Sequence, residues 1–203
     1  MSVARNMRAS LCDRLSEVGA LAPTACEGWQ AQDLAAHLWI RERRLSALPG
    51  IGMERFADRT AQVQNAELHR NGFDTLVSDL RRPAGIMGLF DPVANAAEFT
   101  IHLLDVARPN DLDPGISAED EDKVMGSVSM FARMVARRFD GRIVLRPTRR
   151  EPKSLGRGSR TVHLDGLPSD LLFYLAGRTA HARVEVTGEP DAVARMEEAV
   201  VGL

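Results

Sequence analysis

Two residues in the middle of a long apolar segment have the types and the spacing of metal ligands. Glu98 and His102 are four positions apart in the stretch from Asp91 to Arg108. If this stretch is a helix, the carboxylate and the imidazole lie on one face and point to the same place. Most of its other residues are apolar and they leave almost no polar face, which is typical of a buried helix. A buried carboxylate is unfavourable unless it is paired or coordinated, so we expect another segment or a cation to complete the site.

A third candidate ligand is His37, which lies between two leucines on the apolar stripe of an expected helix that begins near Asp33. With Glu98 and His102 it would form a three-ligand site between bundle helices, leaving coordination positions open for water or a substrate. Asp105, one turn after His102, is placed to accept a hydrogen bond from that imidazole or to act as a spare ligand. This set suits a divalent cation and does not by itself choose among zinc, iron, nickel and manganese. We expect zinc first, with nickel, iron or manganese as alternatives.

From the residues alone, a metal-free alternative stays open. A glutamate and a histidine four positions apart occur together by chance in many helices, and Glu98 and His102 could form a buried ion pair without a cation. The two readings differ in one measurable property. A bound ion must stabilise the fold by mass action, whereas chelation would not change the thermal midpoint of a metal-free core.

Length and composition indicate a globular protein without a nucleic-acid or membrane partner. The chain has 203 residues, 44% of them hydrophobic, and a formal net charge of −2. It has no dominant basic stripe, no signal-peptide pattern and no apolar run long enough to span a membrane, so we expect a cytoplasmic protein. Two cysteines, Cys12 and Cys26, do not make a disulfide framework there. Cys26 could approach the site from the loop before His37, but no histidine or aspartate stands beside it in sequence to activate it.

The hydrophobic periodicity changes near residue 141, which predicts two domains. Before it, apolar residues recur at helical spacing, and after it short segments alternate between apolar and polar residues as strands do. We therefore predict a mainly α protein, with a helical domain over 1–140 and a small α+β domain over 141–203. The expected helices cover 3–18, 33–48, 53–82, 91–108, 118–139, 168–177 and 190–200. The segment 53–82 should break at Asn71-Gly72 and restart with Asp74 as the cap. The expected strands cover 142–147, 160–166 and 182–188.

Several runs of residues resemble one known family. TACEGWQAQDLAAHL (24–38) and NAAEFTIHLLD (95–105) resemble the mycothiol-dependent maleylpyruvate isomerase family, part of the DinB-like superfamily of metal-binding four-helix bundles. GLPSDLLFYLAGR (166–178), followed by VEVTGEP (184–190), resembles that family's small C-terminal domain. RERRLSALPGIG (41–52) is similar to an actinobacterial branch of the family. The resemblance runs in the same order along nearly the whole chain.

The resemblance implies a DinB-like four-helix bundle with His37, Glu98 and His102 as the metal ligands. It also implies a small-molecule isomerase or transferase in which the metal activates a thiol cofactor, mycothiol, or a water. Arg178 would then be a candidate catalytic residue that binds a substrate carboxylate. Such a protein would act as a monomer or a homodimer. The alternative is a metal-binding or stress-response bundle protein without turnover.

One departure from the family affects the helix that carries Glu98 and His102. Members of the similar branch tend to have a histidine and a glutamate directly after the ligand histidine, where this chain has Leu103 and Leu104. These two positions point away from Glu98 on a helix, so the departure leaves the expected ligands in place. It removes a polar face, and with it any substrate or partner that this face would bind.

Overall fold

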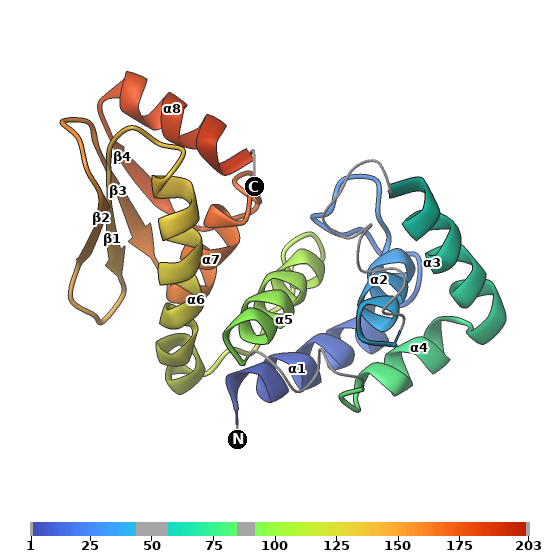
Figure 1. The fold of residues 1–203 in the computed structure, drawn as a ribbon. Helices are drawn as coiled ribbons and strands as arrows, with labels where there is room; N and C mark the ends of the chain where they lie inside the picture. Colours follow the sequence, from blue (N-terminus) through green and yellow to red (C-terminus); the bar gives the residue numbers. More distant parts are fainter. Residues whose placement is uncertain (1, 44–56, 85–91, 202–203) are drawn as a thin grey trace. The chain divides into compact units, whose positions relative to one another are not determined.

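The computed structural model describes residues 2–43, 57–84 and 92–201, which form two compact units (Figure 1). The first unit comprises Met1–Asn95 and His102–Gly115, and the second comprises Ala96–Ile101 and Ile116–Leu203. The described part of the chain is mainly helical with one small four-stranded sheet, as the periodicity predicts. The four-helix-bundle arrangement and the boundary at residue 140 stay predictions. None of the helices in the described ranges combines the length and the apolar character needed to cross a membrane.

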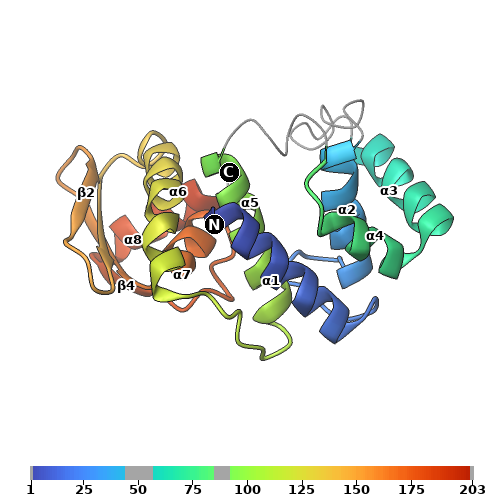
Figure 2. The ribbon, with the colours of Figure 1, turned by 90° about the horizontal axis from the view of Figure 1, so that it is seen from below.

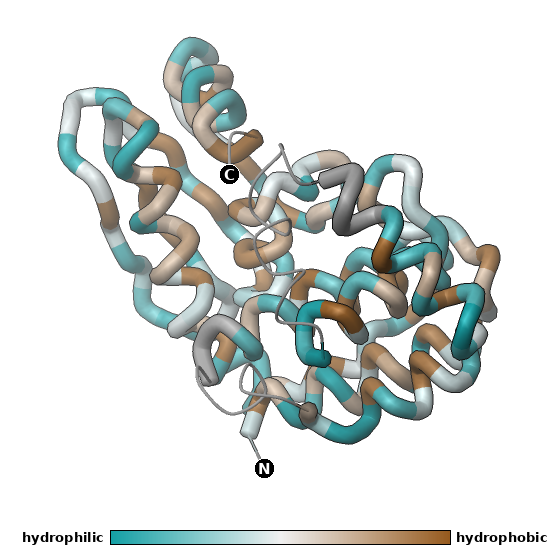
Figure 3. The backbone as a smooth tube through the Cα atoms, turned by 45° about the vertical axis from the view of Figure 1, so that its right-hand side comes forward, coloured by the Kyte–Doolittle hydropathy of each residue, from teal (hydrophilic) through white to brown (hydrophobic). Residues whose placement is uncertain are grey.

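The first unit is built from helices whose boundaries follow local signals in the sequence. Its helices are α1 (Val3–Val18), α2 (Ala31–Arg43), α3 (Ala57–Asn71), α4 (Phe73–Leu80) and most of α5 (Pro92–Ala107). In α1, residues Met7, Leu11 and Leu15 recur every four positions and are buried. α2 packs against α1, α3 and α4. Apolar and polar residues are interspersed along the helices (Figure 3), and in α1 the buried apolar positions lie on one face.

Two predicted helix starts differ from those observed. α4 follows α3 with a change of direction (Figure 2), and its N-cap is Gly72 rather than the predicted Asp74, which lies in the first turn. Gly72 has a φ of 74°, a left-handed conformation that glycine adopts without strain and that interrupts the helix. α2 begins at Ala31, two residues before the prediction, because Asp33 accepts a hydrogen bond from the Gln30 N–H and so caps an earlier turn. The expected end of this helix, and residues 85–91 of the expected loop, lie outside the described residues.

The α5 helix is buried over the residues whose burial the structure describes, as the sequence predicts. Every residue from Asn95 to Ala107 is buried except Glu98, which is half-buried. Arg41 of α2 donates a hydrogen bond to the Asn95 Oδ1 atom of α5 over 3.1 Å, and both side chains are buried. This bond sets the position of α2 along α5, because a buried polar pair loses its hydrogen bond if either helix slides.

The second unit is a two-layer arrangement of helices on a sheet. α6 (Ala118–Ala136) contacts β1 (Arg142–Pro147) and β2 (Lys153–Gly156). The strand order is β2-β1-β3-β4, with β1 and β3 parallel and the other neighbours antiparallel. The remaining elements are β3 (Thr161–Gly166), α7 (Pro168–Leu175), β4 (Glu185–Gly188) and α8 (Pro190–Val201).

The β2 strand is absent from the sequence prediction. Its four residues are KSLG, and only Leu155 among them is buried. A short edge strand with one buried side chain carries no period-two signal, because half of its neighbours are missing. The three predicted strands do alternate, as in β1, where Ile143 and Leu145 are buried between more exposed neighbours.

Candidate metal centre

The α5 helix carries three ionisable side chains at successive turns of one face. Glu98 is half-buried, His102 is 8% exposed, and Asp105 is completely buried. The spacing of four and then three residues places them on one side of the helix. The face is therefore polar inside an otherwise apolar helix, which is the local arrangement that the sequence predicts.

Asp105 orients the His102 ring. The Nδ1 atom of His102 lies 2.8 Å from the Asp105 Oδ2 atom. A carboxylate accepts this hydrogen bond from the neutral imidazole tautomer that carries its proton on Nδ1, and in that tautomer Nε2 has a free lone pair. That tautomer is the one in which Nε2 binds a metal, and histidine ligands commonly have such a carboxylate partner. The contact is the first of the two arrangements expected for Asp105, and its role as a spare ligand stays a prediction.

The imidazole of His37 lies next to that of His102. The two ring centroids are 5.5 Å apart, with an angle of 68° between the ring planes. Trp29 contacts the other side of this pair, with its ring centroid 5.2 Å from that of His37. Trp29 is half-buried, as His37 is, so the indole covers part of the imidazole and limits its rotation.

The predicted ligands lie close to one another. His37, Glu98 and His102 each offer one ligand atom, and these atoms lie within 4.8 Å of one another. Cys26, His102 and Asp105 satisfy the same criterion and form a second group of potential ligands. His102 belongs to both groups. Two imidazoles and a carboxylate form a donor set that zinc and neighbouring transition metals accept, so the residues present fit a divalent cation.

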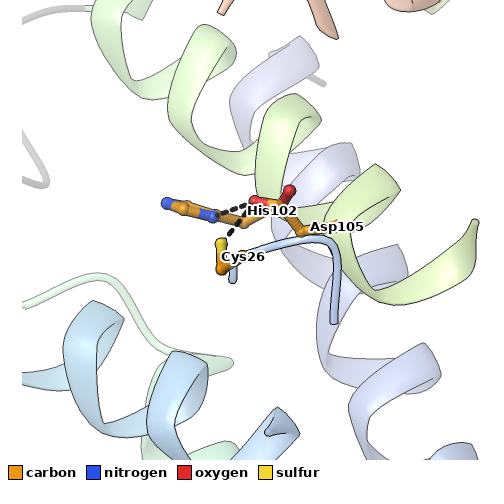
Figure 4. A group of neighbouring side chains, drawn as sticks. All are labelled: Cys26, His102 and Asp105. Carbon is orange, nitrogen blue, oxygen red and sulfur yellow. Dashed lines mark hydrogen bonds and ion pairs between the residues drawn. The ribbon is translucent and has the colours of Figure 1, made fainter. Parts of the chain in front are cut away.

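Cys26 joins this site through Asp105, as Figure 4 shows. Its thiol donates a hydrogen bond to the same Oδ2 atom that binds His102, with 3.2 Å between sulfur and oxygen. The second ring nitrogen of His102 points away from Cys26 and Asp105 in this view. Sequence reasoning placed Cys26 near the site but found no aspartate or histidine beside it. Its actual neighbour is 79 positions away, and no local pattern indicates that contact.

The loop that carries Cys26 is held in place by backbone contacts. The Ala25 N–H donates to the Asp105 carbonyl over 2.8 Å, and the Asn110 side chain donates to the Pro23 carbonyl over 3.0 Å. Within the loop, the Thr24 hydroxyl donates to the Trp29 carbonyl over 2.8 Å. These bonds tie the loop to the end of α5, so the thiol is positioned by several independent contacts.

The other cysteine and the candidate catalytic arginine lie in different surroundings. Cys12 is buried in α1, and this burial raises the pKa of its thiol to about 11. Arg178 follows α7 in the second unit, where it is half-buried and donates to the Ala176 carbonyl over 2.8 Å. Its role in substrate binding stays a prediction.

Comparisons with known proteins find a similar fold. No family model matches the chain, and no curated protein is significantly similar to it. A crystal structure of the mycothiol-dependent maleylpyruvate isomerase has a TM-score of 0.58 and 17% sequence identity, covering 92% of this chain and 91% of that one. A histidine-to-alanine mutant of the same enzyme has a TM-score of 0.52 and 16% identity over the same shares. At this identity the comparisons establish a likeness of fold between this chain and those structures.

Proposed function

We propose that this chain is a cytoplasmic divalent-metal-binding protein that carries out thiol-dependent isomerase or transferase chemistry on a small molecule. Its ligands would be His37, Glu98 and His102, with zinc as the first candidate and nickel, iron or manganese as alternatives. The observation that carries this proposal is the hydrogen bond between His102 Nδ1 and Asp105, because it presents Nε2 as a ligand beside a second imidazole. The likeness of fold to a mycothiol-dependent isomerase supports the choice of chemistry.

The side chains of the site have separate tasks in this proposal. A divalent cation, when bound, would lower the pKa of a coordinated thiol or water and so supply a nucleophile near neutral pH. Asp105 keeps His102 in one tautomer and one orientation. Trp29 covers His37 and reduces its access to water. Arg178 would bind a carboxylate of the substrate with its planar guanidinium group.

Metal binding is tested first, by elemental analysis and by competition with a chromophoric chelator on protein purified without a histidine tag. We expect one ion per chain in the wild type. His37→Ala and His102→Ala should each bind at least about 100-fold more weakly, since each removes a direct ligand. His69→Ala is the matched control, because His69 is exposed at the end of α3. A wild-type protein that holds less than one ion per chain after reloading would exclude the metal site.

The chemistry is tested separately on the metal-loaded protein. Mycothiol and maleylpyruvate are the first thiol and substrate to use, because the similar structure belongs to an enzyme named for both. We expect turnover that needs both the metal and the thiol, and a raised KM in Arg178→Ala with unchanged metal content. Stoichiometric metal without turnover on any thiol or substrate would instead identify a non-catalytic metal-binding protein.

A further inference from the structure

Two adjoining cavities in the second unit lie along α6 and the edge strand β2, which contact each other (Figure 1). The first has a volume of about 580 Å³ and is lined by the C-terminal part of α6 and by residues 153–157. The second has a volume of about 620 Å³ and is lined by the middle of α6 and by residues 150–153. They share Arg133 and Lys153, so they form one continuous groove. Volumes of this size are typical of small-molecule sites.

The lining of this groove is strongly basic. The first cavity has four cationic side chains, Arg133, Arg137, Lys153 and Arg157, and none of its described lining residues is acidic. The second adds Arg150 and one acidic residue, Glu151. We call the surface formed by these four cations and Arg150 the basic groove. Its charge is local, because the whole chain has a formal net charge of −2.

Four of these five cations have no counter-ion within the described ranges, and three of the four also lack a side-chain hydrogen bond there. Arg150 pairs with Asp122 over 2.7 Å, and the Lys153 ammonium donates to the Ser129 hydroxyl over 2.9 Å. Arg133, Arg137 and Arg157 make neither an ion pair nor a side-chain hydrogen bond with any residue that the structure describes. The negative end of the α6 dipole favours the first two of them. It does not account for Arg157, which follows β2, and like charges facing one hollow repel each other.

Two glycines are among the residues that line the groove. Gly126 of α6 has no atom within 4 Å of the place where a Cβ would be, so no side chain fills that part. Gly156 ends β2 with a φ of 81°, and a Cβ there would lie 2.3 Å from the Gly141 carbonyl oxygen. Only glycine allows this close approach. Two of the lining residues therefore add no side chain to the groove, while five others carry long cationic side chains.

We propose that the basic groove is a binding site for a small polyanion with two or more phosphate groups. Arginine presents a planar fork of donors that matches phosphate oxygens, and several phosphate charges are needed to balance the cations that face this hollow. A hollow of this size suits a small molecule, whereas a nucleic acid would need a basic surface that extends beyond it. The proposal is independent of the metal centre, because none of the groove's lining residues belongs to either group of potential metal ligands.

Calorimetric titration with a sugar bisphosphate, and separately with inorganic pyrophosphate, tests the proposal and distinguishes an organic from an inorganic ligand. We expect the wild type to bind at least one of them, and the double variant Arg133→Ala/Arg157→Ala to bind at least about tenfold more weakly. A loss of this size is expected when charge-assisted hydrogen bonds are removed. Both arginines are exposed, so the variant should fold, which its circular dichroism and thermal midpoint would verify.

Arg195→Ala is the matched control for charge. It removes one cation from the exposed face of α8, outside the groove, where Arg195 pairs with Asp191. Binding to this variant should stay within about twofold of the wild type. The proposal is overturned if neither phosphate compound binds, if the double variant binds as the wild type does, or if Arg195→Ala loses as much affinity. Tighter binding of a single-stranded oligonucleotide through the same arginines would overturn it in favour of a nucleic-acid surface.

Discussion

Among single side chains, Asp105 connects the two halves of the candidate site. It is completely buried, and one of its carboxylate oxygens accepts hydrogen bonds from both His102 and Cys26. A buried carboxylate is tolerated when such donors compensate for its lost hydration. The same two bonds fix the imidazole and the thiol relative to each other. Asp105 therefore links the loop before α2 to the histidine of α5.

Replacing Asp105 should weaken metal binding without removing a proposed ligand. In Asp105→Ala, we expect the affinity for Zn²⁺ to fall about 10- to 100-fold, the usual effect of losing the partner of a metal-bound histidine. Competition with a chromophoric chelator measures this. Asp140→Ala, at an exposed position of the second unit, is the control and should bind as the wild type does. Equal affinities for the two variants would show that Asp105 does not orient a ligand.

Cys12 should make the protein less stable at alkaline pH. Burial raises the pKa of this thiol from its ordinary value of 9.0 to about 11. Above pH 9 the unfolded chain releases the thiol proton while the folded chain keeps it, so the free energy of unfolding decreases as pH rises towards 11. The contribution lost by pH 10.5 is about 2 kcal/mol.

Urea unfolding of the wild type and of Cys12→Ala at pH 8 and pH 10.5 tests this. The alanine variant has no thiol to titrate, so its stability should fall by about 2 kcal/mol less between the two pH values. If the free energy of unfolding falls equally in both proteins between pH 8 and pH 10.5, Cys12 does not contribute to the pH dependence.

Among the helices, a buried ion pair joins α1, α2 and α4. Arg8 of α1 donates to both carboxylate oxygens of Glu42 in α2, and its Nη1 atom also donates to the Leu80 carbonyl of α4 over 2.8 Å. Arg8 is 4% exposed and Glu42 1% exposed. One guanidinium group thus holds three helices, and α2 among them carries His37.

Removing Arg8 should destabilise the first unit strongly. Arg8→Ala leaves the buried Glu42 carboxylate with only the longer contact to Arg43, over 3.5 Å, and we expect a loss of about 3 kcal/mol in the free energy of unfolding. Arg81→Ala is the matched control, because Arg81 pairs with Asp13 at the surface over 2.7 Å. That exposed pair should contribute at most about 1 kcal/mol. Denaturant unfolding compares the two, and similar losses would contradict the importance of burial.

For the whole molecule, metal binding and folding should be coupled. A ligand that binds only the folded state stabilises it by about 2.7 kcal/mol at a concentration 100 times its dissociation constant. For a chain of this length, that corresponds to a rise of roughly 5–10 °C in the thermal midpoint. We expect EDTA to lower the midpoint of the loaded wild type and Zn²⁺ to restore it.

His102→Ala provides the comparison for this thermal experiment. It should show no shift with either reagent, because it lacks the histidine shared by both groups of potential ligands. If neither EDTA nor Zn²⁺ changes the thermal midpoint of the wild type, the alternative is favoured in which Glu98 and His102 form a metal-free pair in the core.

Local sequence patterns determine most of the helices and three of the strands. Apolar residues at helical spacing predict α1, α5 and α6, and alternation predicts β1, because both patterns report which face of one element meets the core. The spacing of Glu98, His102 and Asp105 likewise follows from their places on one helix. Each of these predictions involves residues within a few turns of each other.

Only the tertiary structure decided which distant residues meet. The Cys26 thiol reaches Asp105 across 79 positions, and the basic groove combines α6 with the end of β2. β2 itself has one buried residue, so its pairing with β1 supplies the order that its own sequence does not indicate. Such contacts depend on how packed elements are positioned in space, and periodicity along a single element does not encode that position.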